Sequence, residues 1–403
     1  MKKETLLHSL VFTAAAATAA SGADFGGDAA FLQQHTDLIL LRSKDGQAQV
    51  AVAPAWQGRV MTSTAAGPQG RSFGWLNRDL IASGKWQEHI NVFGGEDRFW
   101  MGPEGGQFSV FFAKGSPFEL SHWFTPAPVD TMPYRVVRQA ADRAVFGAEF
   151  KLTNYSGTTF DVQVERTVRV LEPDEAWRHL AVKPAADVKL VAFQSENKIT
   201  NAGRAPWRKE SGLLSVWILG QFNPTPETTI VVPIKSGPES ELGVKATSDY
   251  FGAIPADRFR ATDHAVYLKA DGQFRSKIGI NPRRSRAVLG SYDAGQKVLT
   301  LVQFTQPAGV KDYVNSLWKL QEHPYAGDAA NSYNDGPPSP GAKPLGPFYE
   351  LESSSPAAVL APGASLAHVH RTIHLTGPEP ALNAIAQQVL GVSLADIQHA
   401  FTP

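Results

Sequence analysis

The stretch from Thr158 to Leu171, TTFDVQVERTVRVL, alternates apolar and polar residues. Phenylalanine and valine occupy positions 160, 162 and 164, and aspartate, glutamine and glutamate occupy positions 161, 163 and 165. Successive side chains of a β-strand point to opposite faces of the sheet. This period of two therefore predicts a strand with one buried face and one solvated face.

Similar runs of β-branched and aromatic residues recur on both sides of this stretch, separated by clusters of Gly, Pro, Asn and Asp. The further predicted strands are 37–41, 47–52, 106–112, 135–137, 144–152, 213–219, 228–232, 265–268, 298–304, 348–351 and 367–375. Helices are predicted only at 31–34, 314–320 and 381–400. Because no helical layer alternates with the strands, the pattern predicts a mainly β protein, a large antiparallel sandwich with few short helices.

The composition excludes several classes of function. Lys plus Arg equals Asp plus Glu at 38 each, so no net charge would attract the protein to nucleic acid or to an anionic membrane. The chain contains no Cys, which excludes disulfides, thiolate chemistry and cysteine-based zinc sites. Nine Trp and 22 Phe supply aromatic platforms of the kind on which the C–H faces of sugars stack.

The first 23 residues have the layout of a Sec-type signal peptide. Lys2 and Lys3 precede an apolar stretch that begins at Leu6, and small residues lead up to Ala23. The apolar stretch falls short of the roughly 20 residues that cross a bilayer, and no Cys follows it to carry a lipid. We therefore expect a periplasmic or secreted protein without a transmembrane span in the mature chain. Residues 24–403 are predicted to form a single domain, whose oligomeric state the sequence leaves open.

The densest group of functional residue types spans 89–107, HINVFGGEDRFWMGPEGGQ. Charged side chains lie here among five glycines and three aromatic residues after His89, so the backbone turns sharply while it presents polar groups. The candidates for substrate binding are His89, Asn91, Arg98 and Trp100, and Glu104 is a candidate catalytic residue. The alternative is a glycine-rich turn with a structural pair between Arg and a carboxylate.

A second group, 327–336, reads GDAANSYNDG and is followed by a proline-rich loop. Its candidate substrate-binding residues are Asn331, Tyr333, Asn334 and Asp335. Side-chain oxygens at this density suit the hydroxyls of a sugar or a hard cation such as Ca²⁺, although Asn, Asp and Gly also form ordinary turns. The bidentate glutamate of an EF-hand loop is missing, so we predict no cofactor, with Ca²⁺ as the alternative.

A third group contains Glu350 and Glu352 on a predicted strand. Residues i and i+2 of a strand share a face, so the two carboxylates would lie side by side. Their repulsion together with burial raises the pKa of one of them toward the range of a general base. We predict Glu350 as the base, with Glu104 or Glu352 as its partner. The alternative is that one glutamate bonds an arginine and the other faces water.

Two groups of basic residues complete the candidates. Arg275 and Lys277 are two positions apart, and their side chains could meet a substrate acid or stabilise a developing oxyanion, with Lys277 retained as a substrate-binding candidate. His368, His370 and His374 have residue types that suit a metal, but no nearby carboxylate completes a ligand pattern. We interpret these histidines as structural and predict no metal ligands.

The order of these features resembles that of the aldose 1-epimerase (galactose mutarotase) superfamily over most of residues 35–375. Members place a catalytic glutamate on a strand, then a Pro, a Pro-Gly turn and a closing strand. The same order appears here as Glu350, Pro356, Pro362-Gly363 and the strand from His368. Gly58-Arg59-Val60 is similar to an early strand of the family, and the segment 94–104 to its glycine-rich substrate loop.

This resemblance implies a galactose mutarotase-like supersandwich and a carbohydrate ligand, with Glu350 as base. The epimerases also use a histidine acid in an Asn-His context near mid-chain. The comparable segment here, from Glu196 and Asn197 to Asn201, has no histidine. The acid is therefore unassigned, and epimerase, lyase and hydrolase chemistry all remain open. A non-catalytic carbohydrate-binding protein is the alternative.

Overall fold

The computed structural model describes residues 24–402, so the predicted signal peptide lies outside the described residues. Eleven of the twelve predicted strands overlap an observed strand, and the described residues form three antiparallel sheets. The helices are short, the longest being α6 with 12 residues. The predicted fold class, a mainly β protein with large antiparallel sheets and few short helices, is confirmed.

The largest sheet has ten strands in the order β11-β12-β10-β14-β15-β18-β8-β7-β6-β5. Their bounds are Phe259–Ala261, Ala265–Lys269, Thr228–Pro233, Val288–Asp293, Val298–Phe304, Ser365–Thr376, Lys189–Asn201, Thr159–Val170, Arg143–Thr153 and Arg135–Gln139. In β7 the even positions from Phe160 to Val170 are buried, and the odd positions between them are exposed or half-buried. The alternation seen in the sequence therefore sets which face of this sheet is turned toward the core.

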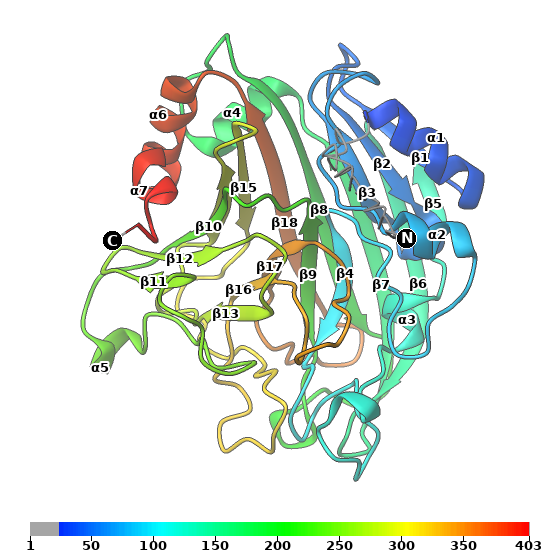
Figure 1. Ribbon diagram of the computed structural model, residues 1–403. Helices are drawn as coiled ribbons and strands as arrows, with labels where there is room; N and C mark the ends of the chain where they lie inside the picture. The colour runs from blue at the N-terminus through cyan, green and yellow to red at the C-terminus, as the bar shows by residue number, and fades with distance from the viewer. Residues whose placement is uncertain (1–23, 403) are drawn as a thin grey trace, which may run out of the picture.

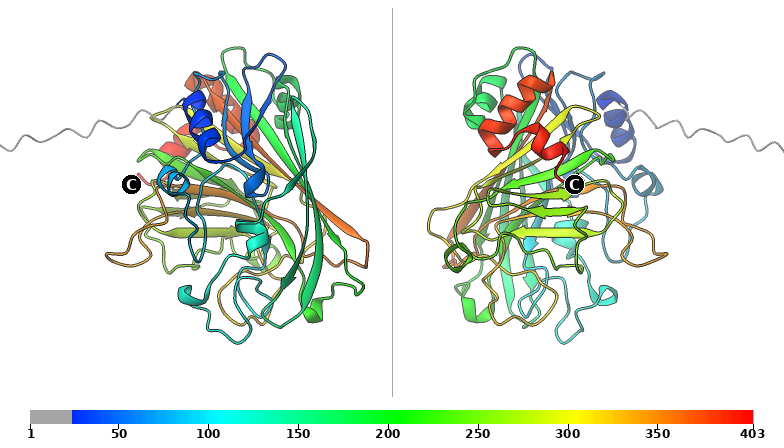
Figure 2. Two further views of the ribbon diagram at one scale, coloured as in Figure 1. Left: turned by 90° about the vertical axis from the view of Figure 1, so that its right-hand side faces the viewer. Right: turned by 60° about the vertical axis from the view of Figure 1, so that its left-hand side comes forward.

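Two smaller sheets lie against the inner face of the ten-stranded sheet (Figure 1). One has five strands in the order β13-β16-β17-β9-β4, and the other has three strands in the order β1-β2-β3. The bounds of the five are Ser276–Ile280, Ala330–Asn334, Tyr349–Ser354, Ser215–Phe222 and Arg98–Gly102. Those of the three are Ile39–Arg42, Gln49–Ala53 and Arg59–Thr64. The loop from β16 to β17, orange in Figure 2, stands out from these sheets.

The α-helices cover the outside of this sandwich, with α1 on one side of the molecule and α6 and α7 on the other (Figure 1). Their bounds are α1 Phe25–His35, α2 Arg78–Ser83, α3 Ala127–Asp130, α4 Pro173–Leu180, α5 Glu239–Leu242, α6 Glu379–Leu390 and α7 Leu394–Gln398. Short 3-10 turns occupy Pro54–Trp56, Leu120–His122 and Lys209–Ser211. Because α4, α6 and α7 bury apolar residues against one face of the ten-stranded sheet, only its other face is left to pack on the smaller sheets.

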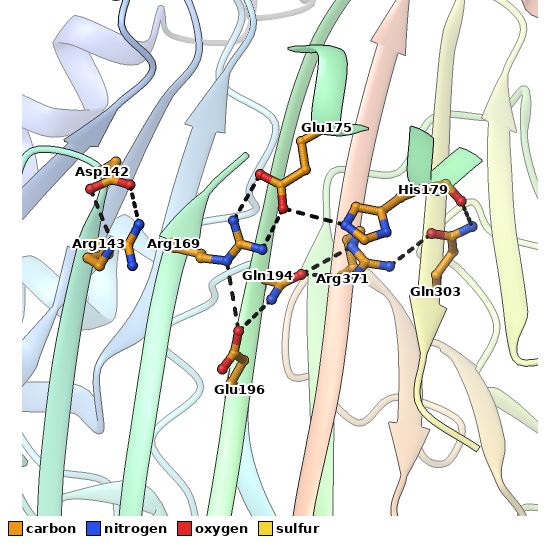
Figure 3. Close-up of polar contacts among 9 residues, drawn as sticks. All are labelled: Asp142, Arg143, Arg169, Glu175, His179, Gln194, Glu196, Gln303 and Arg371. Atoms are coloured by element: carbon orange, nitrogen blue, oxygen red, sulfur yellow. Dashed lines mark hydrogen bonds and ion pairs between the residues drawn. The ribbon is translucent and has the colours of Figure 1, made fainter. Parts of the chain in front are cut away.

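A network of polar side chains holds α4 on the outer face of the sheet (Figure 3). Arg169 of β7 donates hydrogen bonds of 3.0 and 2.6 Å to the two carboxylate oxygens of Glu175. Arg371 of β18 donates to Oε1 of Gln194 at 2.9 Å. Trp177 of α4 is buried in the apolar cluster beneath. These polar side chains hydrogen-bond to one another on the outer face of the ten-stranded sheet. They are therefore separated from the inner sheets.

A buried polar seam joins the ten-stranded and five-stranded sheets. The Ser353 hydroxyl of β17 lies 2.8 Å from Nε2 of His368 and 2.8 Å from Nδ1 of His370, both on β18. His374, further along β18, lies 2.7 Å from a carboxylate oxygen of Glu96. The three histidines are at most 1% exposed. Each has a partner within the fold, which agrees with the structural role expected for them.

Three predicted elements differ from the observed ones. Residues 106–112 form a turn instead of a strand, because Gly106 has φ +79° and its carbonyl accepts from the Ser109 amide. Residues 314–320 are irregular instead of helical, because the Asn315 side chain accepts from the Leu317 amide at 3.1 Å and so competes with helical bonding. The predicted helix 381–400 is divided at Gly391, which ends α6 with φ +74°.

Candidate functional site

One face of the five-stranded sheet carries a row of functional side chains. Strand pairing places Lys277 opposite Tyr333, Tyr333 opposite Glu350, and Glu350 opposite Gln221. Directly opposite residues of antiparallel strands project to the same face. Four side chains from four strands, distant from one another in the sequence, therefore stand side by side.

A second set of side chains follows two positions along the same strands. Glu352 lies opposite Leu219, which in turn lies opposite Arg98 on β4. The carboxylate oxygen Oε2 of Glu352 accepts from Lys277 Nζ at 3.1 Å and from Trp217 Nε1 at 2.8 Å. Glu352 is fully buried, and it holds Lys277 and Trp217 in place from below.

A cavity of about 300 Å³ lies over this face of the sheet. Four of the nine tryptophans line it, namely Trp100, Trp123, Trp217 and Trp318. Its charged lining residues are Arg98, Glu104, Arg275, Lys277, Asp335, Lys343 and Glu350. The cavity thus combines broad aromatic faces with a few ionisable side chains, as small-molecule sites do.

Glu350 lines the cavity from β17, between Tyr333 and Gln221 of the neighbouring strands. Its Oε1 accepts from Gln221 Nε2 at 2.9 Å and faces Arg98 Nη2 at 3.5 Å, whereas Oε2 has no hydrogen-bond partner within residues 24–402. Burial and the neighbouring Glu352 raise the pKa of Glu350 to about 8, although Arg98 and Lys277 act in the opposite direction. A carboxyl group with this pKa exchanges a proton near neutral pH, as a general acid or base must.

The neighbours of Glu350 have shifted pKa values as well. Burial raises the pKa of Glu104 above its ordinary value, against the opposing effect of Lys277. Burial also raises the pKa of Asp335, which is moderated by the hydrogen bond from Tyr333. For Lys277, burial lowers the pKa, but Glu352 and Glu104 outweigh it and the net shift is upward. Lys277 therefore stays positively charged.

Several buried donors on one wall of the cavity have no acceptor within the part of the chain that the structure describes. They are Nε and Nη1 of Arg98, Nε1 of Trp100 and Nε1 of Trp123. The exposed fractions of these three residues are 2%, 3% and 6%. A buried donor without a partner is costly. This wall is therefore suited to a ligand that brings oxygen atoms.

Eight of the twelve sequence candidates line the cavity: His89, Arg98, Trp100, Glu104, Lys277, Tyr333, Asp335 and Glu350. Glu352 lies directly beneath it. The three asparagines do not line it. Asn91 donates to Asp130 at 2.7 Å, Asn331 to the Tyr250 hydroxyl at 3.2 Å, and Asn334 to the Phe274 carbonyl at 2.9 Å.

The lining residues that were missed from the sequence include Trp123, Trp217, Gln221 and Trp318. Trp217 and Gln221 could have been predicted to lie together, because they are an even number of positions apart on the strand 215–222 and therefore share one face. Trp123 and Trp318 lie in segments without a regular pattern. Their places depend on contacts between distant loops, such as the pair of hydrogen bonds between Gln107 and Gln321 at 2.8 and 3.0 Å.

The described residues contain no group of three or more His, Asp or Glu side chains arranged to hold a metal ion. The oxygen-bearing side chains of the segment 327–336 do not converge on one point. Asp328 and Asn331 bond to Tyr250, while Tyr333 and Asp335 bond to each other beside the cavity. Two of the six oxygen-bearing residues of this segment, Tyr333 and Asp335, thus line the cavity, and the other four do not.

Comparison with protein-family models assigns the chain to a family. A family described as Family of unknown function (DUF6786) matches residues 23–401. The chain belongs to this family. A search of curated protein sequences gave no match to this DUF6786 member. Within residues 24–402, no helix of this DUF6786 member is long and apolar enough to cross a membrane.

Solved structures similar to this DUF6786 member include the Slr1438 protein from Synechocystis sp. PCC 6803, at 12% identity and TM-score 0.49 over 85% of this chain and 96% of that one. A putative aldose 1-epimerase from Escherichia coli K12 aligns at 12% identity and TM-score 0.48, over 85% of this chain and 99% of that one. A galactose mutarotase-like protein from Lactobacillus casei ATCC 334 aligns at 10% identity and TM-score 0.45, over 84% and 100%.

Proposed function

We propose that this protein binds a saccharide in the cavity over the five-stranded sheet. The four tryptophans, together with Tyr333 and Phe348, offer apolar faces on which sugar rings stack. Between them, Arg98, Glu104 and Glu350 offer donors and acceptors for hydroxyl groups. A volume of about 300 Å³ suits one or two sugar rings at most, since ligand cavities begin at roughly this size.

We further propose that the protein acts on this saccharide by proton transfer at Glu350. The single observation that carries this proposal is the Glu350 carboxyl in the cavity lining, with Oε2 free of partners among the described residues and a pKa of about 8. Glu104 lines the same cavity and is the second acid–base group. Arg98 faces Glu350 and would stabilise the carboxylate when Glu350 gives up its proton.

The Glu350→Gln variant tests catalysis. Wild-type protein is first screened by thermal shift against a panel of monosaccharides and glycosides, and turnover of each ligand is then followed by NMR. Glu350→Gln should lower turnover at least 100-fold, the usual contribution of an acid–base group, while the Kd changes by less than tenfold. The control Glu165→Gln makes the same change on an exposed strand position with a 59% exposed side chain.

The pH profile of the wild type distinguishes whether Glu350 acts as a general base or as a general acid. A general base must be ionised, so kcat/KM should rise as the pH passes about 8. A general acid must be protonated, so kcat/KM should fall over the same range. If the protein binds a sugar but converts none, it is a non-catalytic carbohydrate-binding protein. If nothing in the panel binds, the saccharide proposal is wrong.

We also propose that the chain is exported, on the strength of its first 23 residues. The full-length chain, expressed in a Gram-negative host, should be recovered from the periplasm with Asp24 as its first residue. N-terminal sequencing of that fraction is the measurement. Recovery of uncleaved chain from the cytoplasm would refute export.

A further inference from the structure

Four basic side chains line the cavity, and two of them have no acidic partner. Lys277 pairs with Glu352 at 3.1 Å, and Arg98 faces Glu350 at 3.5 Å. Within residues 24–402, no carboxylate oxygen lies within 4.0 Å of a side-chain nitrogen of Arg275 or Lys343. Two positive charges at the cavity are therefore available to a ligand.

Arg275 is held in place by an aromatic ring and not by an acid. Its Cζ lies 3.8 Å from the centroid of the Phe251 ring, a cation–π contact that leaves the edge of the guanidinium open. The nearby carboxylate of Asp335 is engaged elsewhere, since it accepts from the Tyr333 hydroxyl at 2.6 Å and from the Gly346 amide at 2.8 Å. The donors of Arg275 are thus positioned at the cavity without being used by that carboxylate.

The part of the cavity lining formed by Arg98, Trp100 and Trp123 likewise has donors without acceptors among the described residues. Arg98 Nε and Nη1 and the indole N–H groups of Trp100 and Trp123 are buried without acceptors in the described chain. A hydroxyl group is both donor and acceptor, whereas an ionised carboxylate only accepts. Arginine binds carboxylates through two parallel N–H···O bonds. The two unpaired cations favour a ligand with an anionic, acceptor-only group, and the surplus donors favour further oxygen acceptors on the same ligand.

We propose that the saccharide recognised by this cavity carries a carboxylate, as a hexuronic acid does, and that Arg275 binds that carboxylate. This inference rests on the proposed saccharide site and adds the chemical class of its ligand. Lys343, on the loop between β16 and β17, lies at the same cavity and adds a second positive charge. The sugar hydroxyls and ring oxygen then meet the donors of Arg98, Trp100 and Trp123.

The charges around the cavity favour an anionic ligand. Arg98, Arg275, Lys277 and Lys343 face the acids Glu104, Asp335 and Glu350 in the lining and Glu352 beneath it, four cations against four acids. Burial raises the pKa of Glu350, Glu104 and Asp335, so protonation of any of these acids leaves the lining with a net positive charge. A carboxylate on the ligand would offset that charge.

The test compares each acid with its parent sugar. Isothermal titration calorimetry is run at pH 7 on the wild type with D-glucuronate, D-galacturonate and D-mannuronate, each beside D-glucose, D-galactose or D-mannose. At least one uronate should bind ten times more tightly than its parent hexose or better. The preference should weaken with added salt, because it depends on charge.

Arg275→Gln should remove the preference and bring the uronate affinity to that of the hexose, while Arg275→Lys should keep part of it. Arg204→Gln, an exposed position outside the cavity, is the matched control and should leave the preference intact. Thermal melting of each variant checks that it is folded.

Three results would overturn the inference. Equal affinity for acid and hexose would leave the saccharide site standing and remove the carboxylate. Tighter binding of hexose 6-phosphates than of uronates would assign the anionic group to phosphate. An uronate preference that survives in Arg275→Gln would place the carboxylate elsewhere. Absence of binding by any sugar would instead refute the saccharide site itself.

Discussion

Single residues in the segment 94–104 divide into those that shape the backbone and those that face the ligand. Gly94 and Gly95 have φ values of +94° and +111°, which side chains rarely adopt. A Cβ on Gly94 would overlap the Trp75 carbonyl oxygen, and a Cβ on Gly95 would lie 2.7 Å from the Val60 carbonyl oxygen. The two glycines let the chain pass between these segments and enter β4, from which Arg98 and Trp100 reach the cavity.

Gly94→Ala should therefore lower the free energy of unfolding by about 3 kcal/mol or more. The left-handed backbone costs an alanine roughly 1–2 kcal/mol, and the overlap with Trp75 adds a similar amount. Gly46→Ala is the matched control, since Gly46 has φ +71° but no atom within 4 Å of the added Cβ. Urea denaturation of both variants measures the difference. Equal losses would mean that the close approach at Gly94 contributes nothing.

At the level of single strands, much of the site was predictable from the sequence. Glu350 and Glu352 were expected on one face of their strand, and the structure places Glu350 in the cavity and Glu352 beneath it. Tyr349 and Leu351 point the other way, into an apolar cluster. Alternation is a property of one strand alone, so a single sequence contains enough information to predict it.

The irregular elements around the cavity could not be predicted in the same way. The segments 106–112 and 314–320 contain the apolar residues of a strand and a helix. The turn at Gly106 prevents the strand, and the bond of the Asn315 side chain to the Leu317 amide prevents the helix. The loops then hold each other through Gln107 and Gln321. Such pairing depends on residues more than 200 positions apart, and a local pattern contains no trace of it.

The composition of the whole site depends on the register of five strands. Lys277, Tyr333, Glu350 and Gln221 become neighbours only because β13, β16, β17 and β9 pair as they do. A shift of one residue in any pair would turn one of these side chains into the core. The sequence predicted three of the four as candidates by residue type, but their alignment in one row is a property of the assembled sheet.

The assembled sheets are joined at the buried seam, where β17 of one sheet meets β18 of the other. His368 and His370 share the Ser353 hydroxyl there. Burial lowers the pKa of His368 to about 3 and that of His370 to about 4. The imidazoles of His368 and His370 are therefore neutral, and protonating either of them in the folded state would place an uncompensated charge between the sheets.

His370→Gln tests how this seam depends on pH. For His370, burial is the main cause of the low pKa, Asp97 opposes it, and Arg166 and Arg371 add to it. Between pH 6.5 and pH 4 the unfolded chain binds a proton at this histidine that the folded chain does not bind. The wild type thus loses stability on acidification through this window, on the order of 3 kcal/mol in total.

The variant lacks the titrating group, so it should be less stable than the wild type at pH 7 and lose that disadvantage as the pH falls to 4. Other titrating groups affect both proteins alike and cancel in the difference. Urea midpoints at half-unit pH steps measure this gap, with His323→Gln, whose side chain is 76% exposed, as the control for loss of a surface histidine. A gap that stays constant from pH 7 to pH 4 would show that His370 binds its proton over the same pH range in the folded and the unfolded chain, and the seam would then have to accommodate an imidazolium between the two sheets at pH 4.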